Sequence, residues 1–336
     1  MTKVANLTTP VRQLLASATQ RLTAAGCDTP RLDAEILLAH LLDRDRSWLY
    51  LQPDAALTLE QQSGYLDLIA RREQRQPVAY LTGHKEFFGL DFLVTPHTLI
   101  PRPETELLIE TALTFVHSYH QLDQPINQTS HLQPSNPPEQ LTMSDKQLTN
   151  PTFQPSNLPT LQPSNPPFTI VDVGTGSGCI AVTLAKLLPL VQLIATDLSG
   201  EALTVARQNA EDQAVADRIK FYQTDLLAPL TEPVNMIVSN PPYLRSTDLA
   251  SPHTAPEVHR HEPRLALDGG GDGLKIIRRL LDQAQKLLAP GGCLLVEIGF
   301  DQGEAVKSLT QTQFPGAQIE IKKDLAGLDR LLVATP

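Results

Sequence analysis

The chain has 336 residues, with 27 Lys and Arg against 37 Asp and Glu and a formal net charge of −10. This length suggests two domains with a sizeable core, and the acidic balance argues against a protein that grips nucleic acid through its phosphates. The three cysteines have no metal or redox spacing, the first ten residues lack a signal-peptide pattern, and no apolar run is long enough to span a membrane. We therefore expect a cytoplasmic protein that binds neither a membrane nor nucleic acid directly.

Residues 1–83 are predicted to form a small helical domain. Apolar residues recur at helical spacing from Val11 to Leu22 and again from Leu32 to Leu41, and a Thr-Pro pair precedes each run. A third run follows Thr58-x-x-Gln61, which is the pattern of a capping box. These stripes indicate a packed core rather than a catalytic site. Beside a larger domain, such a module can recognise a partner.

Residues 84–103 are predicted to be a hairpin and a linker. Aromatic and β-branched residues surround Gly89 in the segment 86–94, which is typical of a hairpin. The prolines that flank Arg102 favour a stiff, extended connection, after which Glu104 or the threonine beside it can begin a helix. Arg102 and Glu104 either belong to a rigid linker or lie near a functional pocket, and the sequence favours neither interpretation.

Residues 104–336 are predicted to form the larger domain, interrupted at about 120–167. Within that interruption the heptamer Leu-Gln-Pro-Ser-Asn-Pro-Pro occurs at 132–138 and again at 161–167. The segment is rich in Gln, Asn, Ser, Thr and Pro and poor in large apolar residues, so it cannot bury enough surface to offset the entropy of ordering. We predict a disordered insertion without a role in catalysis.

A strand followed by a glycine-rich turn opens the rest of this domain. The apolar run 168–173 predicts a buried strand, and Gly174-Thr175-Gly176-Ser177-Gly178 follows it directly, ahead of a predicted helix. Glycines let the backbone turn tightly and approach a ligand closely. Because Cys179 stands where a dinucleotide fingerprint has its last glycine, the turn favours a nucleoside over a dinucleotide.

Two acidic residues follow the next two predicted strands. Asp197 comes after the strand 191–195, a position where an acid can hydrogen-bond ribose hydroxyls. Asp225 follows the strand 219–222, and its carboxylate can accept from an adenine amino group while Leu226 packs on the ring. A helix cap would use Asp225 equally well, and both interpretations stay open.

The stretch Asn240-Pro241-Pro242-Tyr243 ends a buried strand predicted over 235–239. The prolines hold the Asn240 side chain and the Pro241 carbonyl as fixed acceptors at the carboxyl end of a strand, where α/β folds place ligands. Two acceptors in one pocket suit a planar –NH2 group, whose plane Pro242 and Tyr243 can position. Similar strings at residues 136–138 and 165–168 lack a preceding apolar strand and are predicted to be turns.

Three histidines, His253, His259 and His261, follow this motif. Their spacing matches no strong metal-ligand pattern, so we expect an exposed loop here rather than a metal site. A helix is then predicted over 276–288, a strand over 293–298 and a closing antiparallel pair over 318–321 and 329–334. These elements complete a predicted sheet of seven strands.

The order of these signals resembles the class I S-adenosylmethionine-dependent methyltransferases. In that class, an Asn-Pro-Pro-Tyr motif after strand four belongs to enzymes that methylate planar nitrogen. Further segments, together with these motifs, resemble the HemK/PrmC family of N5-glutamine methyltransferases that act on peptide chain release factors: residues 77–83, 86–89, 99–106, 267–270 and 324–330. The resemblance covers almost the whole chain except the insertion.

This resemblance implies a Rossmann-like sheet, S-adenosyl-L-methionine as cofactor and the glutamine of a release factor's Gly-Gly-Gln loop as substrate. It implies a helical domain that helps to hold the release factor, and we expect a monomer without a metal. The residues expected to contact the cofactor are Gly174, Thr175, Gly176, Ser177, Gly178, Asp197, Asp225, Leu226 and Asn240. Those expected to contact the substrate are Asn240, Pro241, Pro242 and Tyr243, with Asn240, Pro241 and Tyr243 in catalytic roles.

Three alternative functions stay open. A glutamine methyltransferase of a ribosomal protein differs only in the amino-terminal half and the linker. A DNA or RNA amino-methyltransferase shares the Asn240 motif, but the acidic balance argues against it. A catalytically silent binding module would not need an intact glycine loop together with Asp197 and Asn240.

Overall fold

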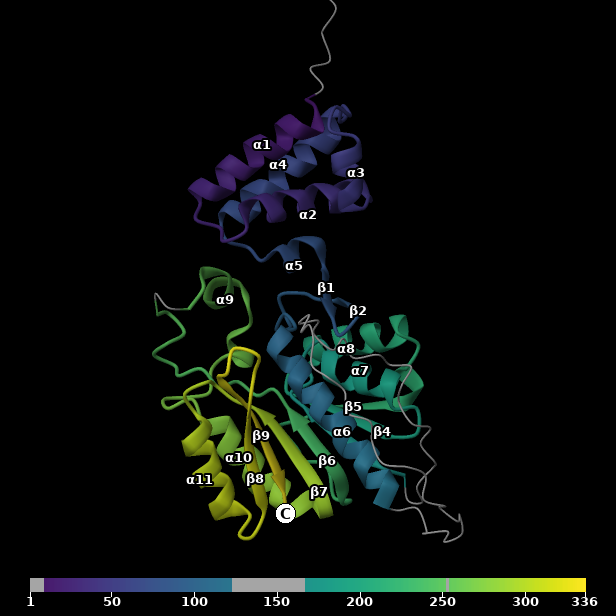
Figure 1. Ribbon diagram of the computed structural model, residues 1–336, viewed down its shortest axis with the longest axis vertical. Coiled ribbons are helices and arrows are strands. Elements are labelled where there is room, and N and C mark those ends of the chain that lie inside the picture. The colour runs from purple at the N-terminus through teal and green to yellow at the C-terminus, as the bar shows by residue number, and fades with distance from the viewer. Residues whose placement is uncertain (1–8, 123–166, 252–253) are drawn as a thin grey trace, which may run out of the picture.

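The computed structural model describes residues 9–122, 167–251 and 254–336. Most of the segment predicted as an insertion, the string at 136–138, the beginning of the string at 165–168 and His253 lie outside these residues. No helix in the described ranges combines the length and the apolar character needed to cross a membrane. Figure 1 shows a helical bundle at one end of the molecule and a twisted sheet with flanking helices at the other.

The amino-terminal helices pack around an apolar core of their own. Their bounds are α1 (Val11–Ala24), α2 (Pro30–Leu42), α3 (Arg46–Leu51), α4 (Leu59–Glu73) and α5 (Val78–Thr82). The apolar side chains that recur at helical spacing in the sequence, such as Val11, Leu22 and Leu37, are fully buried in this core. The predicted capping box is confirmed: Thr58 and Gln61 exchange side-chain and backbone hydrogen bonds at the start of α4.

A hairpin connects the bundle to the sheet. β1 (His84–Phe87) and β2 (Leu90–Leu93) pair antiparallel, and the two turn residues, Phe88 and Gly89, have positive φ angles of 51° and 76°. Positive φ at both turn positions matches the twist of hairpin strands, which explains the glycine. The backbone of Leu93 exchanges two hydrogen bonds with the Asn209 side chain, so the hairpin is fixed to the larger domain.

Within the described residues, the sheet has the seven strands that were predicted, and the structure shows their order to be β5-β4-β3-β6-β7-β9-β8. All are parallel except β9, which runs antiparallel to both of its neighbours. The bounds are β3 (Thr169–Val173), β4 (Gln192–Asp197), β5 (Ile219–Gln223), β6 (Val234–Ser239), β7 (Leu288–Glu297), β8 (Gln318–Lys323) and β9 (Asp329–Thr335). The strand order reverses between β3 and β6, and such a switch point leaves a crevice at the carboxyl ends of the strands.

Helices cover both faces of the sheet (Figure 1). One face packs against α6 (Glu106–Leu122), α7 (Cys179–Leu187) and α8 (Gly200–Asp212), and the other against α10 (Lys275–Leu287) and α11 (Gly303–Gln313). Neighbouring residues of β3 point to opposite faces, so Ile170 joins one apolar core and Val171 the other. This double burial explains the continuous apolar runs that predicted the strands.

The segment after the Asn240 motif differs from the expected exposed loop. Residues Pro256–His261 form a short helix, α9, which lies between the sheet and the helical bundle (Figure 1). Of the three histidines that follow the motif, His259 and His261 are described, and both belong to this helix and are half-buried. A ring nitrogen of His261 lies 3.2 Å from the Gln74 carbonyl oxygen. Within the described ranges, no cluster of His, Cys, Asp and Glu side chains could hold a metal ion.

Candidate active site

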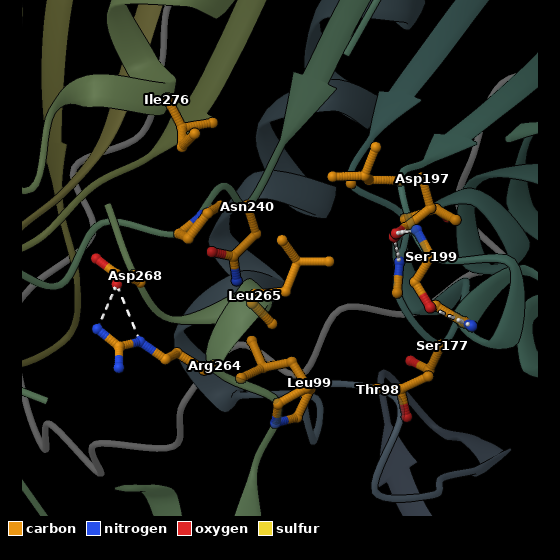
Figure 2. A pocket seen from close by; sticks show the side chains of 18 of the residues that line it. Thr98, Leu99, Ser177, Asp197, Ser199, Asn240, Arg264, Leu265, Asp268 and Ile276 are labelled. Carbon is orange, nitrogen blue, oxygen red and sulfur yellow. Dashed lines mark hydrogen bonds and ion pairs between the residues drawn. The ribbon is translucent and has the colours of Figure 1, made fainter. Parts of the chain in front are cut away.

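A cavity of about 710 Å³ opens at the carboxyl ends of the parallel strands. Its volume is typical of sites for small molecules. The predicted site residues that line it are Gly174, Thr175, Gly176, Ser177, Asp197, Asp225, Leu226, Asn240 and Pro242. Three other predicted site residues do not line the cavity: Gly178, Pro241 and Tyr243. Figure 2 shows Asn240 on one side of the cavity and Asp197 with Ser199 across from it.

The glycine loop after β3 leaves room for a ligand. Gly174 and Gly176 have positive φ angles of 71° and 56°, and a Cβ atom at either position would meet nothing within 4 Å. Gly178 differs, because a Cβ there would lie 3.1 Å from the Ala206 Cβ. Two of the three glycines therefore shape an open cradle, while the third lets α7 approach α8.

The Asp197 carboxylate is held at the edge of this cradle. Its Oδ2 accepts a hydrogen bond from the Gly176 amide and its Oδ1 from the Ser199 amide, both at 2.8 Å. Burial raises the pKa of Asp197 above its ordinary value, although these backbone hydrogen bonds act in the opposite direction. Each oxygen keeps a second lone pair, so the carboxylate can accept from two neighbouring hydroxyls of a ligand.

Asp225 and Leu226 lie in the cavity wall after β5. Asp225 is followed by a turn rather than a helix, so the helix-cap interpretation is wrong, and its Oδ2 accepts from Arg279 at 2.5 Å. Leu226 has a φ of 56°, which is rare for a residue with a side chain. Backbone strain of this kind clusters at ligand sites, where the surrounding structure maintains it.

The Asn240 side chain is oriented by a residue far away in the sequence. Its Nδ2 donates to the Thr105 Oγ1 at 3.1 Å, across 135 residues of chain. No residue in the described ranges hydrogen-bonds to the Asn240 Oδ1, which remains available to accept from a ligand. Pro241 is buried, and Tyr243 is half-buried with its hydroxyl donating to the Glu297 Oε1 at 3.3 Å.

The backbone of the Asn240 motif is clamped from the other side. The Gln302 Nε2 donates to the Tyr243 carbonyl at 2.9 Å. Gly273 has a φ of 77°, and a Cβ there would lie 2.4 Å from the same carbonyl oxygen. At Gly269 a Cβ would lie 2.8 Å from the Pro242 carbonyl oxygen. The glycines of this loop therefore permit a backbone contact that no other residue would allow.

Arg102 and Glu104, for which the sequence left two interpretations open, have different surroundings. Arg102 lines the cavity and donates to the buried Glu262, which follows α9. Burial raises the pKa of Glu262, while the Arg102 charge lowers it. Glu104 is exposed and does not line the cavity. For Arg102 the structure therefore favours the interpretation that places it near the pocket, whereas Glu104 does not line the cavity.

This sheet order, with a glycine loop after the first strand and an acid after the second, defines the class I S-adenosylmethionine-dependent methyltransferases. Residues 13–83 match the PrmC N-terminal domain, and residues 157–272 match the Methyltransferase small domain. The chain belongs to the release factor glutamine methyltransferase family. Members from Moorella thermoacetica, Koribacter versatilis and Nitratidesulfovibrio vulgaris are 39%, 36% and 37% identical to it, over 96% of this chain in each case. The alignments cover 98%, 97% and 93% of those proteins, respectively.

S-adenosylmethionine is the methyl donor of this class, and the cavity fits it. The open cradle at Gly174 and Gly176 admits a ligand against the backbone, and the Asp197 carboxylate presents lone pairs to hydroxyl donors. Beside them, Leu226 offers an apolar surface for a base. The chemistry of these donor and acceptor groups therefore matches a nucleoside cofactor.

Proposed function

We propose that this protein transfers a methyl group from S-adenosylmethionine to the side-chain amide nitrogen of the glutamine in the Gly-Gly-Gln loop of peptide chain release factors. The observation that carries the proposal is the place of Asn240. Asn240, whose amide oxygen pairs with no residue in the described ranges, lines the same cavity as Asp197, in a chain that matches release factor glutamine methyltransferases along almost its full length.

At the cofactor end, we assign ribose binding to Asp197 and adenine binding to Asp225 and Leu226. The loop from Gly174 to Gly178 would lie against the rest of the cofactor, and Asn240 would border the methyl group. The cofactor supplies a methyl group made electrophilic by a positively charged sulfur. The protein's contribution is therefore to hold the acceptor in the correct orientation and to exclude water.

At the substrate end, the residues must make a poor nucleophile reactive. The lone pair of an amide nitrogen is delocalised into its carbonyl group. Hydrogen bonds from the –NH2 group to the Asn240 Oδ1 and the Pro241 carbonyl oxygen favour a pyramidal nitrogen with a localised lone pair, while Pro242 and Tyr243 position the amide plane. No strong general base is required, because the methylated nitrogen is acidic and loses its proton late.

We further assign a role to each part of the chain. Residues 1–83 hold the release factor, residues 84–103 link the two domains and residues 104–336 carry out the transfer. The ion pairs from Arg72 and Arg75 to Glu257 support this division, because they join the bundle to the helix that follows the substrate motif. We propose that the protein acts as a monomer in the cytoplasm, without binding nucleic acid or a membrane.

The test is transfer of labelled methyl groups to unmethylated release factor. Parallel reactions contain the release factor with its loop glutamine changed to alanine, a mixture of ribosomal proteins, or DNA. We expect label on the release factor only, and no label on its Gln→Ala variant. Label on ribosomal protein or on DNA would replace the proposed substrate with one of these alternatives.

A further inference from the structure

Asn240 stands at the end of a chain of hydrogen bonds that leads into the protein core. After the 3.1 Å bond from Asn240 to Thr105, the Thr105 hydroxyl donates to the Glu297 Oε2 at 2.7 Å. The Tyr243 hydroxyl donates to the other carboxylate oxygen, Oε1, at 3.3 Å. Thr105 and Glu297 are only 2% and 1% exposed, so water does not compete for these bonds.

The protons available along this series of hydrogen bonds allow only one orientation of the Asn240 amide. An ionised carboxylate only accepts, so the single hydroxyl proton of Thr105 is committed to Glu297. Toward Asn240, the Thr105 oxygen can therefore only accept, and the –NH2 group of Asn240 must face it. A flipped Asn240 amide would place two oxygens against each other without a proton between them.

We propose that Glu297, acting through Thr105, fixes the polarity of the Asn240 amide and thereby makes the pocket select a carboxamide over a carboxylate. A glutamine side chain and a glutamate side chain have nearly the same shape, so packing cannot distinguish them. They differ in that the amide offers two N–H donors where the carboxylate offers only acceptors. A fixed acceptor at the Asn240 Oδ1 bonds the first and repels the second. The inference rests on the proposed function for the identity of the substrate.

Protonation of Glu297 does not remove this control. Burial raises the pKa of Glu297 to about 7, and the negative charge of Glu104 raises it further. The hydrogen bonds from Thr105 and Tyr243 and the positive charge of Arg330 lower this pKa, but they do not outweigh burial. The bond at Oε2 is shorter than the contact at Oε1, so the added proton belongs on Oε1, beside Tyr243. Oε2 continues to accept from Thr105, and Asn240 keeps its orientation.

Two pairs of variants separate this role from a general effect on structure. Glu297→Leu has a similar size but no acceptor, which frees the Thr105 proton and lets Asn240 flip. Glu297→Gln is the matched control, because it keeps one side-chain oxygen. That oxygen is expected to accept from Thr105, where the hydrogen bond is shorter. In the same way, Thr105→Val removes the hydroxyl and Thr105→Ser retains it. If Glu297→Leu does not fold, the comparison of Thr105→Val with Thr105→Ser tests the proposal.

The experiment measures how well a release factor with its loop Gln→Glu inhibits methylation of the unchanged release factor. The ratio of its Ki to the KM of the glutamine substrate reports selectivity for the amide. We expect this ratio to fall about tenfold or more in Glu297→Leu, the size of one mispaired buried polar group. Thr105→Val should behave similarly, while Glu297→Gln and Thr105→Ser keep the wild-type ratio. A wild-type ratio in folded Glu297→Leu or Thr105→Val would overturn the proposal.

A second measurement does not depend on the substrate. Hydrogen exchange of the Asn240 side-chain –NH2 group, followed by NMR on the full chain, reports whether that group faces Thr105. We expect slow exchange in the wild type and in Glu297→Gln, and faster exchange in Glu297→Leu. Equal exchange in all three would refute the polarity control even if release factor is the substrate. Failure of the wild type to methylate release factor would refute the proposed function alone.

Discussion

The two ends of the active-site cavity are built in different ways. At the cofactor end, Asp197 is held by the backbone amides of Gly176 and Ser199, and the first of these contacts spans only 21 residues of chain. At the substrate end, Asn240 depends on Thr105, and Thr105 on Glu297, across 135 and 192 residues. The cofactor end therefore follows from local backbone shape, whereas the substrate end exists only after the whole sheet has formed.

The largest effect should come from Asn240→Ala, at the substrate end. We expect turnover of release factor to fall by roughly 10²-fold or more, the typical cost of losing one oriented catalytic hydrogen-bond partner. Calorimetric titration should show that cofactor affinity changes far less, because Asp197 and the glycine loop are untouched. A loss of cofactor affinity as large as the loss of turnover would contradict the separation of the two ends. Unchanged turnover would show that Asn240 has no catalytic role.

The next effect is expected at the cofactor end, from Asp197→Ala. Loss of hydrogen bonds to a charged acceptor should weaken cofactor binding by about 10-fold to 100-fold. At saturating cofactor, turnover should stay near the wild-type value, because Asn240 keeps its partners. Asp197→Asn is the matched control, since it retains one acceptor oxygen. Its cofactor affinity should lie between those of the wild type and Asp197→Ala. A fall in turnover that saturating cofactor does not restore would mean that the ends are coupled.

The same contrast explains what the sequence could predict. The strands, the glycine loop and Asp197 follow from apolar periodicity and from residues that are close in the chain, and the structure brings them together as expected. The sequence also singled out Asn240, because the prolines mark it locally. Nothing in the local sequence predicts the roles of four other residues, because these roles depend on partners from distant segments: Thr105, Glu262, Glu297 and Gln302. Within α9, the expectation of a loop failed because contacts with the bundle are not visible in a local pattern.

A smaller fall in turnover than that of Asn240→Ala is expected where the backbone of the substrate motif is clamped. In Gly273→Ala, the new Cβ would lie 2.4 Å from the Tyr243 carbonyl oxygen, at a φ of 77°. We expect the free energy of unfolding to fall by about 1–3 kcal/mol and turnover to fall about tenfold as the motif shifts. Gly271→Ala is the control, because a Cβ there meets nothing within 4 Å. Urea unfolding and steady-state kinetics measure the two quantities, and equal behaviour of both variants would contradict the clamp.

The smallest effect is expected where the substrate end continues into the helical bundle. Glu257 of α9 accepts from Arg72 at 2.8 Å and from Arg75 at 2.7 Å, and the Arg72 and Glu257 side chains are only 6% and 16% exposed. We expect Glu257→Gln to raise the KM for release factor about threefold, because a loosely docked bundle must be ordered on binding. The cofactor affinity should not change. Asp54→Asn, which breaks an ion pair whose side chains are both 67% exposed, should leave the KM unaltered.

The pH dependence of this docking has a definite sign. Burial raises the pKa of Glu257, but the hydrogen bonds from Arg75 and Arg72 outweigh it, so the pKa lies below the ordinary value of 4.5. A group with a lowered folded-state pKa contributes stability above its unfolded pKa and loses it as the pH falls through the folded value. The protection of α5 amides against hydrogen exchange, measured relative to the intrinsic exchange rate at each pH, should therefore fall below pH 4.5 in the wild type. In Glu257→Gln this protection should be low already at neutral pH, with little further change on acidification. A parallel pH response in both proteins would show that Glu257 does not hold the bundle in place, and that the substrate end stops at the sheet.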